Sequence, residues 1–197
     1  MSLVSRLRTS ILPACVVPLC LALSAALLAP AHGAAAAGRL PSERQWRHDV
    51  ARVMKGSHAF IDRRTAGTHK RLAINFDIDN SALATHYRRG TAIPAVHSFA
   101  LYAKRHGVAL LFNTARAGAP LRHARADLTK AGYPVTRVCG RKSRREPTAH
   151  GKQRCRARFR AAGFTIIANV GNRATDFSGP RNYGKAYRLP NYGNQLS

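Results

Sequence analysis

Short apolar segments alternate with amphipathic ones along most of the chain. Largely apolar runs at residues 72–78, 108–113 and 164–170 are typical of buried strands, and the most continuous of them, at residues 108–113, is typical of a strand that is covered on both faces. A shorter run at residues 135–139 predicts a fourth strand, and residues 187–189 predict an additional strand at a sheet edge. All of the predicted strands therefore fall after residue 70.

Two segments between these runs, at residues 93–105 and 120–130, have apolar positions at the spacing of one helix face and are followed by glycines, which predicts two helices. A cap at Ser42 and a stop at Gly56 predict a helix at residues 43–55, and shorter helices are predicted at residues 57–64 and 152–162. Strands that alternate with helices favour right-handed crossovers between parallel strands. The predicted fold class is therefore α/β, with a Rossmann-like, mostly parallel sheet and helices on both faces.

Polar residues follow the ends of three predicted strands. Asp77 and Asp79 end the first strand, Thr114 follows the second, and Asp176 comes soon after the run at residues 164–170. Side chains two residues apart in a strand point to the same side, so we expect the two aspartates to face one site. A solvated turn is the alternative for an isolated D-x-D. However, the chain has only 8 Asp and Glu against 33 Lys and Arg, which favours a site at this strand end.

The first 36 residues have the regional order of a secretory signal peptide. Two arginines precede an apolar run at residues 11–28, and small residues follow it, so cleavage is expected after Ala31 or between Ala34 and Ala37. A retained membrane anchor is the alternative, since about 18 apolar residues can span a bilayer. The prolines within the run favour removal, and we therefore expect a secreted, extracellular protein with no membrane contact. The mature chain is expected to consist of an N-terminal helical segment and a core domain, at residues 37–69 and 70–197.

Export would leave two cysteines in the mature chain, Cys139 and Cys155. Two cysteines in an oxidising compartment most simply pair with each other. A metal site is the alternative, but neither cysteine has a second cysteine at CxxC spacing or a histidine at ligand spacing. A disulfide that closes a loop of about 15 residues contributes roughly 3 kcal/mol to stability.

The formal net charge is +25, and it falls to +23 when a leader with two arginines is removed. Such a positive field attracts polyanions and phosphorylated ligands, and salt screens it. Aromatic residues make up only 7% of the chain and do not alternate with basic residues, so no specific nucleic acid partner is predicted. The expected partners are phosphorylated small molecules, nucleotides among them, and polyanions that bind the basic surface.

Four motifs, taken in order, resemble those of the haloacid dehalogenase-like (HAD) superfamily. They are Asp77–Ser81 (D-I-D-N-S), Thr114 at the end of an apolar strand, Lys152, and Gly171–Asp176 (G-N-R-A-T-D). Within the superfamily, Phe76–Ser81 and Asn169–Phe177 resemble the secreted acid phosphatases of the class B and plant vegetative storage protein type. The resemblance covers roughly residues 70–180 and implies a phosphoric monoester hydrolase on a HAD-like fold.

The resemblance implies a catalytic role for four residues. Asp77 would attack the phosphomonoester and form an aspartyl-phosphate, and Asp79 would be the general acid and base. Thr114 would bind the phosphoryl oxygens. Lys152, at the start of the helix before the last buried strand, would stabilise the charge of the phosphate and the nucleophile; Arg141 or Lys142 are the alternatives.

The resemblance also implies a Mg²⁺ site. The ion would bind Asp77, the backbone carbonyl of Asp79, and Asp176 or Asn172, an oxygen-rich set that suits a hard cation. Asn172 occupies a position where the family more often has Asp, so we expect weaker Mg²⁺ binding. Arg116 is expected either to contact substrate or to solvate the crevice.

Cap domains that select substrates in the superfamily are inserted in two gaps, and both gaps are short in this chain. The segment from Ser81 to Ala115 and the loop at residues 140–151 leave no room for a large cap, so an open crevice and broad specificity are expected. The predicted function is an exported, Mg²⁺-dependent acid phosphatase. The rival hypothesis is a catalytically weak or inactive HAD-like protein that binds phosphorylated polyanions, and it is motivated by Asn172 and by the net charge.

Overall fold

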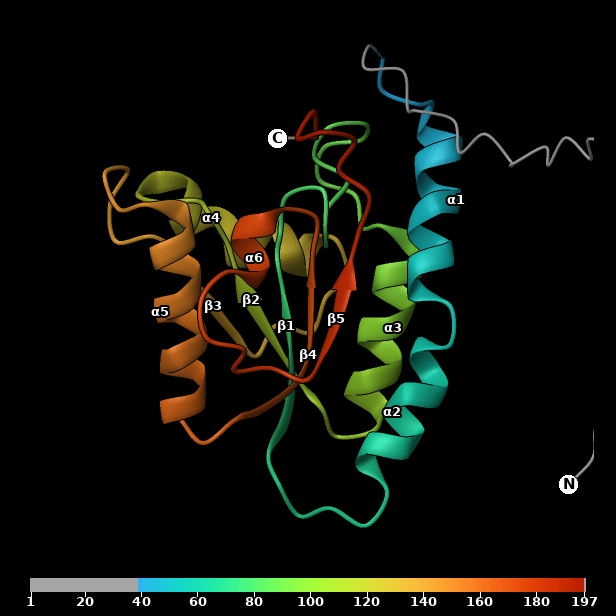
Figure 1. The fold of residues 1–197 in the computed structure, drawn as a ribbon, viewed down its shortest axis with the longest axis vertical. Helices are drawn as coiled ribbons and strands as arrows, with labels where there is room; N and C mark the ends of the chain where they lie inside the picture. Colours follow the sequence, from blue (N-terminus) through green and yellow to red (C-terminus); the bar gives the residue numbers. More distant parts are fainter. Residues whose placement is uncertain (1–38, 197) are drawn as a thin grey trace, which may run out of the picture. The chain divides into compact units, whose positions relative to one another are not determined.

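The computed structural model describes residues 39–196, and the predicted signal peptide lies outside these described residues. Five parallel strands form one sheet in the order β3-β2-β1-β4-β5 (Figure 1). The predicted α/β class with a mostly parallel sheet is confirmed. The strands are β1 (Leu72–Phe76), β2 (Ala109–Asn113), β3 (Arg137–Cys139), β4 (Thr165–Gly171) and β5 (Lys185–Arg188).

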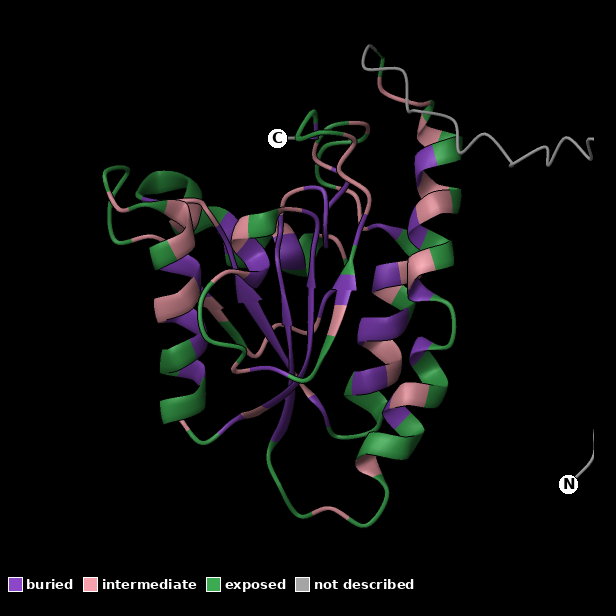
Figure 2. Ribbon diagram, viewed as in Figure 1, coloured by how far each residue is buried: buried purple, intermediate pink, exposed green. Residues whose placement is uncertain are grey.

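Helices cover both faces of the sheet, with α5 on one side and α1, α2 and α3 on the other (Figure 1). Buried residues of α1 to α4 share one apolar cluster, while those of α5 and α6 belong to a second. In Figure 2 the strands are mostly buried, and each long helix has a buried and an exposed side. The helices are α1 (Glu43–Met54), α2 (Ser57–Thr65), α3 (Pro94–Arg105), α4 (Ala119–Lys130), α5 (Thr148–Ala161) and α6 (Ala174–Phe177).

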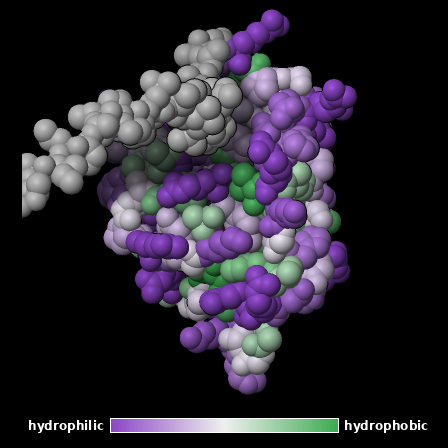
Figure 3. Space-filling view, turned by 45° about the vertical axis from the view of Figure 1, so that its right-hand side comes forward, coloured by the Kyte–Doolittle hydropathy of each residue, from purple (hydrophilic) through white to green (hydrophobic). Residues whose placement is uncertain are grey.

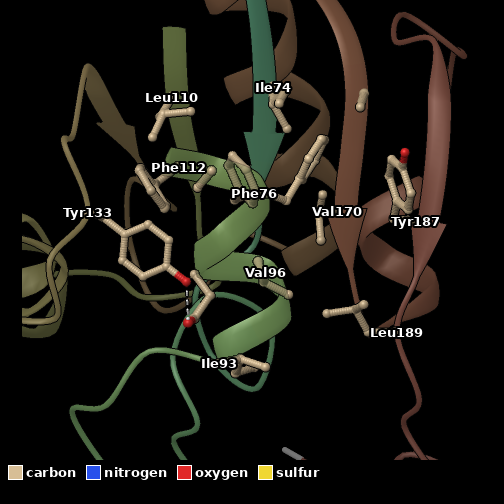
Figure 4. Packing of buried hydrophobic residues seen from close by; sticks show 14 of the residues in the cluster. Ile74, Phe76, Ile93, Val96, Leu110, Phe112, Tyr133, Val170, Tyr187 and Leu189 are labelled. Atoms are coloured by element: carbon tan, nitrogen blue, oxygen red, sulfur yellow. Dashed lines mark hydrogen bonds between the residues drawn. The ribbon is translucent and has the colours of Figure 1, made fainter. Parts of the chain in front are cut away.

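The larger apolar cluster supports the loop that follows β1. The rings of Phe76 and Phe112 stack with centroids 5.5 Å apart in this cluster (Figure 4). The Tyr133 hydroxyl donates a hydrogen bond to the Ala82 carbonyl, at 2.8 Å. Because Tyr133 is buried, this bond attaches the loop carrying Asp77 and Asp79 to the core.

The outer surface is mainly hydrophilic, as expected for a chain with so many basic residues. Figure 3 shows hydrophilic side chains over most of the visible face, separated by small hydrophobic areas. Within residues 39–196, no helix has the length and apolar character needed to cross a bilayer. Between β1 and α3 the described chain has two isolated bridges and no inserted domain, so no large cap covers this end of the sheet.

Three features differ from the predicted elements. The first strand ends at Phe76 and not at residue 78: the Asp77 N–H still donates to Val170, at 2.8 Å, and the chain then turns through Asn80 with a φ of 55°. The short helix α6 was not predicted. Helix α5 begins four residues before the predicted start, so Lys152 lies one turn inside it.

The sequence pattern did not predict the early start of α5, because the buried side of this helix is not apolar. That side includes a lysine, an arginine and a glycine as well as a cysteine and a phenylalanine, so the apolar spacing of a helix is missing. Pro147 precedes the first helical residue, and its fixed φ suits a helix start.

Candidate active site

A pocket of about 370 Å³ lies at the carboxyl ends of the central strands. Strand β1 is paired with β2 on one side and β4 on the other, so the loops after these three strands meet there. Four of the residues predicted for the site line the pocket. The lining consists of Asp77, Asp79, Thr85, Ala115, Thr148, Lys152, Arg173, Thr175 and Asp176.

Lys152 lies between two buried carboxylates. Its ammonium contacts Asp77 Oδ1, forms an ion pair with Asp176 Oδ1 at 2.7 Å, and donates to the Asn113 carbonyl at 2.7 Å. The exposed fractions of Lys152, Asp77 and Asp176 are 2%, 7% and 3%. Two carboxylates buried at this depth need a counter-charge, and Lys152 supplies it.

The buried cluster shifts the protonation of its members. Burial, followed by the nearby Asp176 charge, raises the pKa of Asp77 to about 6, although Lys152 and Ser81 act in the opposite direction. Burial opposes the charged form of Lys152, but Asp176 and Asp77 outweigh it and raise the pKa of the ammonium. Lys152 therefore stays charged, while Asp77 changes protonation in the mildly acidic range.

Asp79 lines the same pocket, but its carboxylate faces different partners. Arg116 donates to it twice, from Nη2 to Oδ1 at 2.7 Å and from Nε to Oδ2 at 3.0 Å, and Thr85 donates at 2.8 Å. Burial acts against ionisation, yet Arg116 and Thr85 keep the pKa of Asp79 below its ordinary value. Both aspartates reach one site as expected, but they do so from the turn after β1 and not by strand alternation, because the strand ends before either of them.

Arg116 is also held in place by a second carboxylate, that of Asp127. Its Nη1 forms a 2.7 Å ion pair with Asp127 of α4, so Arg116 connects α4 to Asp79. From the sequence alone, Arg116 is expected either to contact substrate or to solvate the crevice. The signal available for Arg116 was its position three residues after the end of a strand, whereas no sequence signal pointed to Thr85.

Thr114 is fully buried and is not one of the residues that line the pocket. Its N–H donates to the Cys139 carbonyl at 3.0 Å, and its hydroxyl oxygen accepts a hydrogen bond from the Arg116 N–H at 3.2 Å. Thr114 therefore orders the chain that leads to Arg116. In this structure it lies close to the site without facing its cavity.

Asn172 uses both ends of its amide. Its Oδ1 lies 3.3 Å from the Ser81 hydroxyl, which also donates to Asp77 Oδ2 at 2.8 Å. Its Nδ2 donates to the Leu196 carbonyl at 3.3 Å and to Asn191 at 3.4 Å. An aspartate could not donate these last two bonds, so Asn172 attaches the C-terminal segment to the pocket.

The oxygen atoms at this place fit a hard divalent cation. Asp77 Oδ2 and Asn172 Oδ1 both lie within hydrogen-bonding distance of one hydroxyl, and oxygen ligands are those that Mg²⁺ prefers. Within the described range, no group of three or more His, Cys, Asp or Glu side chains could hold a metal. Arg116 occupies the Asp79 carboxylate, so a cation at this place would use the Asn172 amide oxygen and a backbone carbonyl beside the remaining carboxylates.

Asp176 is positioned by bonds that the sequence did not reveal. Its Oδ2 accepts from the Arg173 N–H at 2.9 Å, and its carbonyl accepts from Asn169 and from the buried Arg156, each at 2.8 Å. A Cβ at Gly171 would lie 2.4 Å from Asp176 Oδ2, so only glycine leaves room for this carboxylate. Arg156 lacked any motif by which it could have been found.

The other predicted residues lie beside the pocket. The Arg141 guanidinium donates to the Ala115 carbonyl at 2.5 Å, so Lys152, and neither Arg141 nor Lys142, reaches Asp77. Cys139 and Cys155 are paired in a disulfide, with their Cα atoms 5.7 Å apart. This disulfide joins β3 to α5, the helix that carries Lys152.

Comparison with known proteins agrees with this geometry. A family model described as HAD superfamily, subfamily IIIB (acid phosphatase), matches residues 85–195, which include Lys152 and Asp176 but begin after Asp77 and Asp79. No curated protein matches the chain.

Two solved structures of a class C acid phosphatase from Bacillus anthracis are similar in fold. The one with tungstate bound has a TM-score of 0.57 at 18% identity, and it covers 70% of this chain and 67% of its own. The other has a TM-score of 0.54 at 17% identity, with the same coverage of both chains. At these identities the likeness shows the fold alone.

Proposed function

The chain belongs to the acid phosphatases of HAD superfamily subfamily IIIB, and on that premise we propose an exported, Mg²⁺-dependent phosphatase that acts through an aspartyl-phosphate. One observation carries the mechanism: the buried Lys152 ammonium lies between Asp77 and Asp176 at the carboxyl end of β1. A buried carboxylate beside a fixed positive charge is suited to attack a phosphorus atom and to have the anionic product stabilised.

The reaction has two displacement steps. In the first, an Asp77 oxygen forms a bond to phosphorus, the bond from phosphorus to the ester oxygen breaks, and Asp79 gives a proton to the leaving alcohol. In the second, Asp79 takes a proton from water, the water oxygen attacks phosphorus, and the bond to Asp77 breaks to release phosphate. Arg116 favours the ionised form of Asp79 that the second step needs, and an acidic medium supplies the proton for the first.

Asp77, the Asp79 carbonyl, Asn172 and Asp176 are the residues that would bind Mg²⁺. When bound, the cation would neutralise part of the charge on the phosphoryl oxygens. The chain's own contribution is the placement of Asp77 by Ser81 and Lys152, and the placement of Asp176 by Arg156.

The proposed substrates are phosphomonoesters of small molecules, nucleotides among them. Support comes from the uncapped carboxyl edge of the sheet, where the described chain places no inserted domain over the pocket. Secretion rests on the N-terminal sequence pattern.

Hydrolysis of an aryl phosphate, with Mg²⁺ or with EDTA, tests this proposal. The wild type, Asp77→Asn and the matched surface variant Asp62→Asn would be compared from acidic to neutral pH. We expect turnover that depends on Mg²⁺, falls at least 10³-fold in Asp77→Asn, and is unchanged in Asp62→Asn. Full turnover by Asp77→Asn would exclude Asp77 as nucleophile, and no turnover by the wild type would exclude the enzyme.

A second function is favoured by the substitution at position 172. Asn172 supplies no negative charge, and its amide is bonded to the C-terminal segment, so the site has one acidic ligand fewer than is usual in the family. If the wild type has no turnover, a binding protein for phosphorylated polyanions becomes the leading account.

A further inference from the structure

A second cavity, of about 830 Å³, is larger than the candidate pocket and lies along the edge strand β3. Its two walls come from α4 and α5, and the buried Phe159 and Phe164 contribute to its lining. We call this cavity, together with the residues that line it, the basic groove. Nothing in the proposed reaction uses it.

Eight arginines and lysines line the basic groove, and no aspartate or glutamate does. Only Arg154 among them forms an ion pair with a carboxylate in the described part of the chain, with Glu146 at 2.8 Å. Four of the eight have no hydrogen-bonding or ion-pair partner for their charged groups within residues 39–196. These four are Arg122, Arg137, Lys142 and Arg158.

Other arginines of the groove are fixed by uncharged partners. Arg125 donates to the carbonyls of Val135 and Thr136 at 3.0 and 3.2 Å, and Arg71 donates to the Ala162 carbonyl at 3.1 Å. A carbonyl partner orients a guanidinium without cancelling its charge. The groove therefore presents oriented and uncompensated positive charge, which is what an anion needs.

The length of the groove favours a chain of anionic groups over a single anion. Arg71 and Arg137 lie together at one end of the groove, where their guanidinium carbons are 4.5 and 5.9 Å from the centroid of the Phe164 ring. The lining continues along β3 to Arg141 and Lys142 near the carboxyl edge, and the three strand residues alone correspond to roughly 10 Å. One phosphate cannot contact both ends.

The chemistry of the lining favours phosphate. Seven of the eight basic side chains are arginines, whose planar fork matches phosphate oxygens. The two phenylalanines are buried, at 4% and 6% exposure, so no exposed ring in the groove can stack on a base. We propose that the basic groove binds a linear polymer of phosphates through the phosphates alone.

Binding should not depend on turnover, so it is measured with EDTA present. Fluorescence anisotropy would follow two labelled probes of this shared chemistry, a long inorganic polyphosphate and a single-stranded oligonucleotide, at several salt concentrations. Arg122→Gln/Arg158→Gln would be compared with Arg63→Gln/Arg64→Gln on α2. Both double variants lose the same two charges, but only the first loses them from the groove.

We expect Arg122→Gln/Arg158→Gln to bind both probes about tenfold more weakly, with a slope of log affinity against log salt that is smaller by roughly 1.4. The α2 variant should stay near the wild type, and pyrophosphate should not displace either probe. Unchanged aryl phosphate hydrolysis and an unchanged melting temperature would show that the groove variant is folded.

Three results would overturn the proposal. Equal weakening by the two double variants would indicate diffuse attraction by net charge. Displacement by pyrophosphate at a similar concentration would indicate a compact anion site. Binding of the oligonucleotide without the polyphosphate would indicate that bases are read. None of these results bears on hydrolysis at Asp77, so this proposal and the proposed function fail separately.

Discussion

Positive charge is arranged in opposite ways in the pocket and in the basic groove. At the pocket, Lys152 and the neighbouring Arg116 are largely buried, and each contacts two carboxylates. In the groove, Arg122 and Arg158 are exposed and have no such partner among the described residues. Burial accounts for the difference, because a desolvated charge must be paired while a solvated one need not be. An excess of basic residues can therefore supply both a fixed, paired charge at the pocket and an exposed surface of unpaired positive charge.

The largest difference should appear when one lysine is removed from each region. Lys152→Met leaves Asp77 and Asp176 buried without their cation, so kcat/KM should fall about 10³-fold and unfolding should become easier by about 3 kcal/mol. Lys142→Met removes an exposed groove charge and should change stability by less than about 0.5 kcal/mol. Aryl phosphate kinetics and urea unfolding measure both effects. Similar stability losses in the two variants would contradict the proposed difference between a buried, paired lysine and an exposed one.

The disulfide lies where the two regions meet, since Cys139 lines the groove and Cys155 is on the helix that carries Lys152. Cys139→Ser/Cys155→Ser should lower the free energy of unfolding by roughly 3 kcal/mol. We also expect kcat to fall, because α5 loses its bond to β3, and groove affinity to fall with it. The kcat and the groove affinity are measured well below the melting temperature of the variant. Full activity in a folded double variant would show that packing alone positions Lys152.

Adding a negative charge to the pocket tests the balance between its carboxylates and the cations that neutralise them. Asn172→Asp should lower the melting temperature without metal, because a third carboxylate joins Asp77 and Asp176 and the bond to Leu196 is lost. With Mg²⁺ the loss should reverse, and half-saturation should occur at about tenfold lower Mg²⁺. Thermal melting with and without Mg²⁺ is the measurement. Asn194→Asp adds the same charge on the exposed surface and should show neither effect.

The smallest effect is expected at Glu146, the carboxylate that pairs with Arg154 of the groove among residues 39–196. Hydrogen bonds from Arg154 and then from the Lys142 N–H lower the pKa of Glu146 to about 2. A lowered pKa adds stability above the unfolded value, near pH 4.5, and this stability is lost as the pH falls toward 2. Glu146→Gln should therefore melt about 2 °C below the wild type at pH 6, and the gap should close by pH 2. A gap independent of pH would exclude ionisation as its cause.

Much of the fold and the identity of the pocket residues could be predicted because both depend on local patterns. Continuous apolar runs mark buried parallel strands, and parallel strands bring their carboxyl ends to one edge. Asp77, Asp79 and Asp176 therefore reach the same pocket although about a hundred residues separate the first from the last.

The contacts within the pocket could not be predicted, because they depend on where long side chains reach across the fold. Arg116 pairs with Asp79 and Asp127, and Asn172 donates to Leu196; no spacing in the sequence encodes either contact. The location of the basic groove could not be predicted from the sequence either. It requires knowing that β3 is the edge strand and that α4 and α5 flank it.

One rigid helix is shared by the two regions, since α5 places Lys152 in the pocket and Arg158 in the groove. Lys152 and Arg158 are six residues apart on this helix, so a displacement of the whole helix would move both. Thermodynamic reciprocity then has a direct consequence: if a groove ligand changes the affinity of the pocket for phosphate, phosphate changes the affinity of the groove by the same factor. In that case, and only then, phosphate released at Asp77 would also change how tightly the groove holds its ligand.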